Sequence, residues 1–146
     1  MVYQNKLWDS YKSMGERKIA EYLKVGGIRF TYEKPVAVLD GGKTKIWHPD
    51  FYLDDYHVMV EYLGMTGKPE NDRINGHKRT VYRENRYDVI EIYPSDFKAD
   101  WQKTIDRGIY NTLEGRLKDY ISKRKNDAES IGPDRKHYQA SFRYRH

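Results

Sequence analysis

The chain contains no cysteine, and it lacks other features of secreted and membrane proteins. Without cysteine it can form no disulfide and no thiolate metal site. Its mean hydropathy is -1.00, and no apolar run approaches the roughly 20 residues that cross a bilayer. No charged-then-apolar stretch typical of a signal peptide opens the sequence. We therefore expect a cytoplasmic protein with no membrane partner.

Charge and tyrosine are abundant instead. The 146 residues include 14 tyrosines, and the formal net charge is +5. Residues 116–146 hold nine Lys and Arg against four acids, which accounts for that whole net charge. A neutral body with a basic end indicates a polyanionic partner such as DNA, bound partly by counterion release. A merely solubilising basic end fits the charge equally well.

Hydrophobic periodicity predicts the order of the secondary-structure elements. Ser13 followed by Glu16 has the form of a capping box at the start of a helix. Gly41-Gly42 suggests the turn of a hairpin, and Gly108 and Gly115 are expected to divide the last helix. The expected elements are a helix at 13–24, extended segments at 28–39 (interrupted at Pro35), 45–53 and 57–63, a helix at 72–85, a strand at 87–93 and a helix at about 96–125.

This order predicts an α/β fold in which helices flank a mixed sheet. An antiparallel meander followed by a helical crossover to one more strand gives such a sheet. We expect a single domain at 1–125, with its core at about 13–93 and the extra C-terminal helix at about 96–125. Residues 126–146 are polar and basic, and we expect a tail that is flexible or ordered only against a partner.

Three acids lie at unusual positions for acidic side chains. Asp50 and Glu61 fall within two successive apolar strands, and Glu16 shares the apolar face of the first helix. A turn at Asp54-Asp55 would bring Asp50 beside Glu61, where the two carboxylates repel unless a cation lies between them. Mg²⁺ or Mn²⁺ would relieve that repulsion. Taken singly, each strand acid is more often at a sheet edge or paired with a base.

Together these segments resemble the PD-(D/E)XK nuclease superfamily, which includes restriction endonucleases and Holliday junction resolvases. The similarity covers about residues 13–93 and rests on Gly15-Glu16, on His48-Pro49-Asp50-Phe51 and on Val60-Glu61-Tyr62-Leu63-Gly64. The resemblance implies a restriction-endonuclease-like αβββαβ core and Mg²⁺-dependent hydrolysis of DNA. It also implies metal ligation by Asp50, Glu61, the backbone carbonyl of Tyr62 and Glu16.

One position departs from the family pattern. The usual catalytic lysine lies two residues after the second strand acid, where this chain has Leu63. Some members supply the lysine from the next helix, and Lys78 fits that variant because it shares an apolar stripe with Ile74, Val81 and Tyr82. We expect its ammonium to point inward. Lys68, Lys45 and an inactive site remain alternatives, and His48 is a weaker candidate for a phosphate contact or a base.

Basic residues are candidates for gripping the DNA backbone. They are Arg73, Arg79 and Arg83 in the helix at 72–85, and Lys123, Arg124 and Lys125 at the end of the last expected helix. Small members of this superfamily include nucleases that act on branched or single-stranded DNA, and a junction resolvase would act as a homodimer. Two rival interpretations stay open: a non-catalytic nucleic-acid-binding module with a decayed nuclease fold, and a helical protein whose basic end binds an acidic partner.

Overall fold

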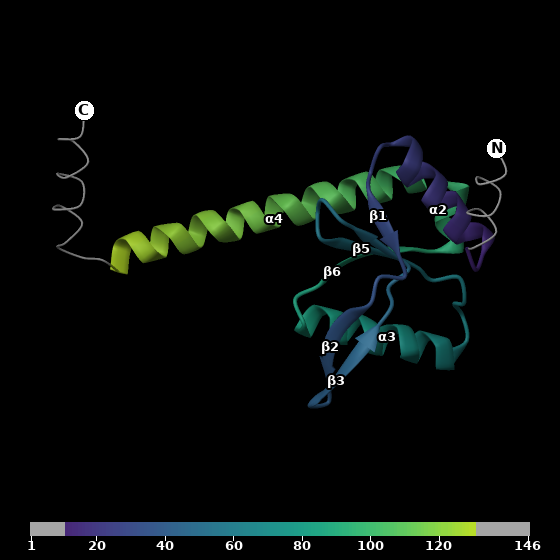
Figure 1. Cartoon of the computed structure of the whole chain (residues 1–146), viewed down its shortest axis with the longest axis horizontal. Coiled ribbons are helices and arrows are strands. Elements are labelled where there is room, and N and C mark those ends of the chain that lie inside the picture. The colour runs from purple at the N-terminus through teal and green to yellow at the C-terminus, as the bar shows by residue number, and fades with distance from the viewer. Residues whose placement is uncertain (1–10, 131–146) are drawn as a thin grey trace. The chain divides into compact units, whose positions relative to one another are not determined.

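The computed structural model describes residues 11–130 of the chain (Figure 1). It divides into two compact units after Tyr110. No helix among the described residues is long and apolar enough to cross a membrane. The elements in chain order are α2 (Met14–Val25), β1 (Phe30–Tyr32), β2 (Val36–Asp40), β3 (Lys43–Trp47), β4 (Phe51–Leu53), β5 (Val58–Tyr62), α3 (Pro69–Glu84), β6 (Asp88–Ile92), the 3-10 helix η1 (Pro94–Lys98) and α4 (Trp101–Ser130).

A four-stranded mixed sheet in the order β1-β4-β5-β6 forms the centre of the first unit. β4 pairs antiparallel with β1 and with β5, whereas β5 and β6 are parallel neighbours joined by the α3 crossover. The predicted α/β class, with helices flanking a mixed sheet, is therefore confirmed.

The segment 45–53 is not one strand, and the prediction was wrong there. It divides at His48-Pro49 into β3 and β4, and β3 pairs with β2 in a separate hairpin around Gly41-Gly42. Proline has no backbone N–H to donate to a strand ladder, so the chain leaves one sheet before Pro49 and enters the other after it. The break predicted at Pro35 is present, because β1 and β2 lie on either side of it.

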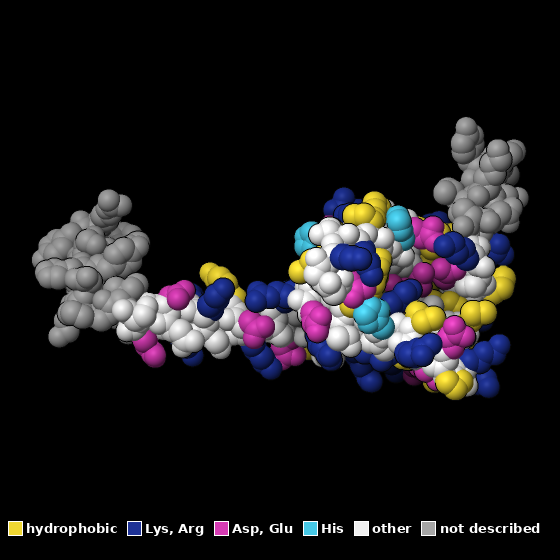
Figure 2. Space-filling view, turned by 90° about the horizontal axis from the view of Figure 1, so that it is seen from below, with side chains coloured by type: hydrophobic (Ala, Val, Ile, Leu, Met, Phe, Trp, Pro, Cys, Tyr) yellow, Lys and Arg dark blue, Asp and Glu magenta, His cyan; other side chains and the backbone are white. Residues whose placement is uncertain are grey.

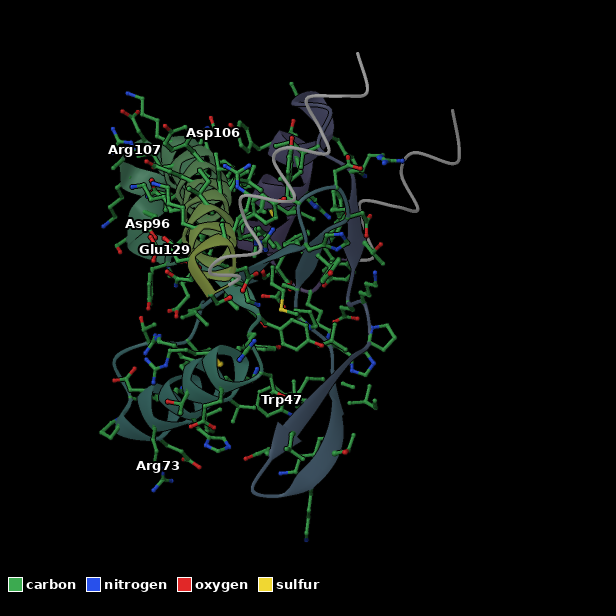
Figure 3. All side chains as sticks on the ribbon, turned by 90° about the vertical axis from the view of Figure 1, so that its left-hand side faces the viewer. Trp47, Arg73, Asp96, Asp106, Arg107 and Glu129 are labelled. Carbon is green, nitrogen blue, oxygen red and sulfur yellow. The ribbon has the colours of Figure 1, made fainter. Side chains whose placement is uncertain are left out.

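Alternation along the strands gives the sheet two buried faces. One face packs Phe51 and Val60 against α2 and against Ile105 of α4. The opposite face packs Met59 against Val81 of α3 and against the β2–β3 hairpin. In Figure 1, α2 and α3 accordingly lie on opposite sides of the sheet. Trp47 points from the hairpin toward α3, where its ring meets that of Tyr82 edge-on (Figure 3).

Helix α4 is continuous through both of its glycines, which corrects the expected break. A Cβ at Gly108 would lie 2.6 Å from Ile90 Cδ1, so this glycine lets the helix approach the sheet closely. A Cβ at Gly115 would meet nothing within 4 Å. The helix also extends to Ser130, past the expected end near residue 125. Within the second unit, Leu113 and Leu117 of this helix are exposed. The expectation for the remaining tail falls on residues outside the described range.

Gly15 sets how closely the start of α2 approaches the sheet. Ser13 caps this helix by accepting a hydrogen bond from the Glu16 N–H at 3.1 Å. A methyl group on Gly15 would overlap the ring of Tyr62, which follows Glu61 on β5. The missing side chain therefore lets the first turn of α2, and Glu16 with it, reach the end of β5.

Replacing Gly15 with alanine is expected to lower the free energy of unfolding by about 1–3 kcal/mol, because the methyl group overpacks against Tyr62. The matched control is Gly76→Ala in α3, where a Cβ meets nothing within 4 Å. There the better helix former should raise stability by about 0.5–1 kcal/mol. Urea titrations of the two variants measure this, and equal midpoints would contradict the packing described for Gly15.

Candidate functional site

Asp50 and Glu61 lie side by side, Glu61 on β5 and Asp50 directly before β4 rather than within a strand as predicted, because the chain breaks at His48-Pro49. Phe51 pairs with Val60 in the β4–β5 register, so Asp50 and Glu61 occupy the next pair of positions, on the sheet face toward α3. Their side chains are close enough to hydrogen-bond to each other. Asp50 Oδ2 also accepts a hydrogen bond of 2.7 Å from the Tyr62 N–H. The hairpin geometry expected from the turn at 54–55 is therefore present.

Burial makes this carboxylate pair unfavourable when both groups are charged. Glu61 is only 8% exposed, and burial together with the negative charge of Glu61 raises the pKa of Asp50 to about 7. Burial also raises the pKa of Glu61. Two such groups at hydrogen-bonding distance must share a proton or have a cation beside them.

Glu16 joins this pair from the first turn of α2. It is 4% exposed, and its pKa is raised first by burial and then by the charge of Asp50. The Ser13 hydroxyl donates to Glu16 Oε2 at 3.1 Å. The predicted capping box is thus only half formed. The Ser13 hydroxyl accepts from the Glu16 N–H as expected, but the Glu16 carboxylate binds the Ser13 hydroxyl instead of the Ser13 backbone N–H. Three acids from α2, the start of β4 and β5 converge as the sequence predicted.

Two tyrosines bind Glu16 and Glu61, and neither was predicted from the sequence. The Tyr32 hydroxyl donates to Glu16 Oε1 at 3.2 Å, and the Tyr82 hydroxyl donates to Glu61 Oε1 at 3.2 Å. Burial and these carboxylates raise the pKa of both phenols, so both remain protonated donors at neutral pH. Among 14 tyrosines, nothing in the spacing of these two marks them out.

Lys78 is the lysine that borders the acids from α3. It lines the same cleft, and its positive charge opposes the rise in the pKa of Glu61. The predicted inward stripe is only partly present, because Val81 is buried whereas Ile74 and Lys78 are exposed to the open cleft. Leu63, at the position where the PD-(D/E)XK nucleases that the chain resembles usually have their lysine, also lines this cleft.

The two lysines that were alternatives to Lys78 do not line the acid cleft. Lys45 pairs with Asp40 at 2.9 Å within the β2–β3 hairpin. Lys68 is the exposed residue before α3 and is not part of the cleft lining. Lys12, which no sequence signal indicated, pairs with Glu33, and the charges of Glu16 and Asp50 also raise its pKa. It is a second cation close to the acids.

The acid cleft has a volume of about 320 Å³ and is lined by the three acids together with Tyr62, Leu63 and Lys78. Within residues 11–130, no group of three or more Asp, Glu or His side chains has the geometry of a ready metal site. The donor set nevertheless fits Mg²⁺, which usually keeps several waters and takes one or two carboxylates rather than a complete protein cage. Ligation by the Tyr62 carbonyl stays a prediction.

The remaining predicted site residues, a histidine and the basic residues, do not line the acid cleft. His48 is exposed and does not line the cleft. Arg79 is bound to Glu91 of β6, with Nη2–Oε2 at 2.6 Å, so that guanidinium is already neutralised. Arg73 is exposed and points away from α3 (Figure 3), and Arg83 lines a neighbouring cavity. The cluster 123–125 is exposed on α4 in the second unit.

The face of the molecule in Figure 2 carries Lys and Arg interspersed with Asp and Glu, rather than a field of one sign. Any contact with a polyanion on this face would therefore depend on local groups of cations rather than on one continuous positive surface.

Comparison of the chain with protein-family models, with curated proteins and with solved structures gave no match.

Proposed function

We propose that the chain is a Mg²⁺-dependent DNA endonuclease of the PD-(D/E)XK type. The order of α2, β1, β4, β5, α3 and β6 agrees with the αβββαβ core of that superfamily, with the β2–β3 hairpin inserted between its first two strands. The acids also occupy places like those that the resemblance implies, with Glu16 on the first helix, Asp50 directly before the second core strand and Glu61 on the third.

The observation that carries this proposal is the convergence of Glu16, Asp50 and Glu61 on one cleft that Lys78 borders. Asp50 and Glu61 would hold the divalent ion, and Glu16 would complete its surroundings directly or through water. A bound Mg²⁺ polarises a phosphate and lowers the pKa of water. The buried carboxylates, which otherwise need a shared proton, gain a stable ionised form beside such an ion.

The chain's own residues then orient and stabilise the reacting groups. The hydroxyls of Tyr32 and Tyr82 each donate to one carboxylate oxygen, which fixes how those carboxylates face the cleft. Lys78 has no hydrogen-bond or ion-pair partner among the described residues, so its ammonium is available to a phosphate oxygen or to the attacking water. There it would offset the negative charge that develops as the phosphodiester bond breaks.

A non-catalytic nucleic-acid-binding module is the second candidate, and Leu63 is the observation that favours it. This side chain lies in the cleft where the family has its lysine, and it can neither donate a proton nor carry charge. If the site is inactive, salt-sensitive binding of nucleic acid would persist without any cleavage.

One assay separates the two candidates. Purified protein is incubated with single-stranded, duplex, flapped and four-way DNA, and with single-stranded RNA, in Mg²⁺, Mn²⁺ or EDTA. We expect cleavage of at least one DNA with either metal and none in EDTA. Survival of every substrate in every condition would contradict the proposal. Symmetrical cutting of four-way DNA would require a dimer of this chain, which light scattering would detect.

A further inference from the structure

A second cavity lies directly beside the acid cleft. It has a volume of about 290 Å³ and lies between α3 and the strands β5 and β6. Glu61, Leu63, Asn75 and Lys78 line both hollows, so the two meet along these four side chains. A group in this second cavity would therefore sit beside whatever phosphate lies between Lys78 and the acids.

The walls of this cavity are mainly carbon. Leu63 and Val89 contribute aliphatic surface, and the rings of Tyr82 and Tyr87 lie 6.1 Å apart at 88°. Both phenol hydroxyls are already bound to the protein, because Tyr82 donates to Glu61 and Tyr87 donates to the Ala37 carbonyl at 2.9 Å. These tyrosines consequently offer their rings, rather than their hydroxyls, to an occupant.

The cavity has few other polar groups, and they are a neutralised ion pair, one amide and two exposed cations. Arg79 and Glu91 bind each other through two hydrogen bonds, so that wall presents a neutralised pair. Asn75 has no hydrogen bond from its side chain to another described residue, and its amide could donate and accept. Arg83 and Lys78 are exposed cations on the lining. An uncharged planar group inside the cavity would fit the rings and the amide. Phosphates attached to it would lie outside the cavity, near the exposed cations.

We propose that this cavity receives an unpaired base from the strand whose phosphate lies in the acid cleft. Aromatic rings stack on bases without regard to sequence, and one amide can bond to a base edge. A base inside a continuous duplex cannot enter, because it would first have to leave its stack. The inference rests on the proposed function and narrows the substrate to DNA with an unpaired nucleotide next to the cleavage point.

A single-nucleotide bulge provides a defined probe for this idea. Three duplexes of the same sequence are compared: one fully paired, one with a bulged adenine and one with a bulged abasic residue. In Mg²⁺ the wild-type protein should cut beside the adenine bulge with a kcat/KM about tenfold or more above that for the abasic bulge. Equal rates on the two bulges would overturn the inference while leaving the endonuclease proposal intact.

A variant that fills the cavity gives the matching test from the protein side. Val89→Phe places a ring in this cavity and not in the acid cleft, whose lining does not include Val89. It should remove the preference for adenine over the abasic bulge. Val25→Phe makes the same change at a side chain that is 84% exposed, and it should keep the preference. Preference retained in a folded Val89→Phe protein would overturn the inference.

Failure of cleavage would still leave a decisive measurement. If the wild-type protein cuts none of the three duplexes, affinity for the two bulges is measured in EDTA by fluorescence anisotropy; the endonuclease proposal itself fails only if the single-stranded, flapped and four-way DNA also survive. Tighter binding of the adenine bulge, abolished by Val89→Phe, would support the cavity as a base site on a non-catalytic protein. Equal affinity, or no binding, would overturn it.

Discussion

Glu61→Gln should lower Mg²⁺-dependent cleavage by roughly 10³-fold, the largest effect that we expect from any single substitution. The amide keeps the shape of the side chain but removes a charged metal ligand, and metal polarisation of a phosphate contributes several kcal/mol to the rate. The measurement is the initial rate of cleavage on the best substrate in saturating Mg²⁺, with binding of the same DNA followed in parallel by anisotropy.

The stability of Glu61→Gln distinguishes a lost ligand from a lost fold. Since burial already disfavours the charge on Glu61, removing that charge should leave the metal-free melting temperature unchanged or higher at pH 8. Glu21→Gln on the exposed side of α2 is the matched control and should cleave like wild type. A folded Glu61→Gln protein with undiminished cleavage would remove Glu61 from the site.

Lys78→Met should lower kcat by about 10²-fold with a smaller change in KM, because loss of one charged donor in a site of this kind removes transition-state stabilisation. Methionine keeps most of the apolar stem and loses only the ammonium. Lys68→Met, just outside the cleft, is the matched control and should change kcat little.

Lys12 is the rival for this role, since the charges of Glu16 and Asp50 act on it. Its ion pair with Glu33 should limit its part, and Lys12→Met is expected to have the smaller effect on kcat. If Lys12→Met removed more activity than Lys78→Met, the catalytic cation would lie on the α2 side of the acids.

The acid cluster could be predicted from the sequence because patterns within short segments of the chain determine it. The apolar stripe of the first helix includes Glu16, and the register of one short hairpin brings Asp50 beside Glu61. Both depend on residues within about a dozen positions of each other. The mixed sheet followed from the order of elements, since a helix between two strands favours a parallel crossover.

Features that depend on distant segments were not predictable in this way. The hydroxyl of Tyr82 reaches Glu61 across 21 positions, and that of Tyr87 reaches Ala37 across 50. Gly108 looked like a helix break, yet it serves close packing on Ile90, which lies on another element. A glycine's local propensity does not reveal whether the absent side chain is needed for contact.

Tyrosine also supports the site in a way that composition alone does not reveal. At Tyr32 and Tyr82 the hydroxyl binds an acid while the ring packs against one of the two cores. An amphipathic side chain of this kind links an apolar interior to a buried polar group. This arrangement explains how a cleft with three acids can exist next to a core without any buried side-chain nitrogen or oxygen left unbonded among the described residues.

Titration of the protein with Mn²⁺, followed by the loss of the free-ion electron paramagnetic resonance signal, tests the central claim most directly. At pH 8 the wild-type protein should take up Mn²⁺, and Asp50→Asn should lose most of that uptake. Because the pKa of Asp50 is raised to about 7, protons should compete with the ion and weaken uptake as pH falls below that value. No uptake by the wild type, or equal uptake by Asp50→Asn, would contradict convergence of these acids on one divalent ion.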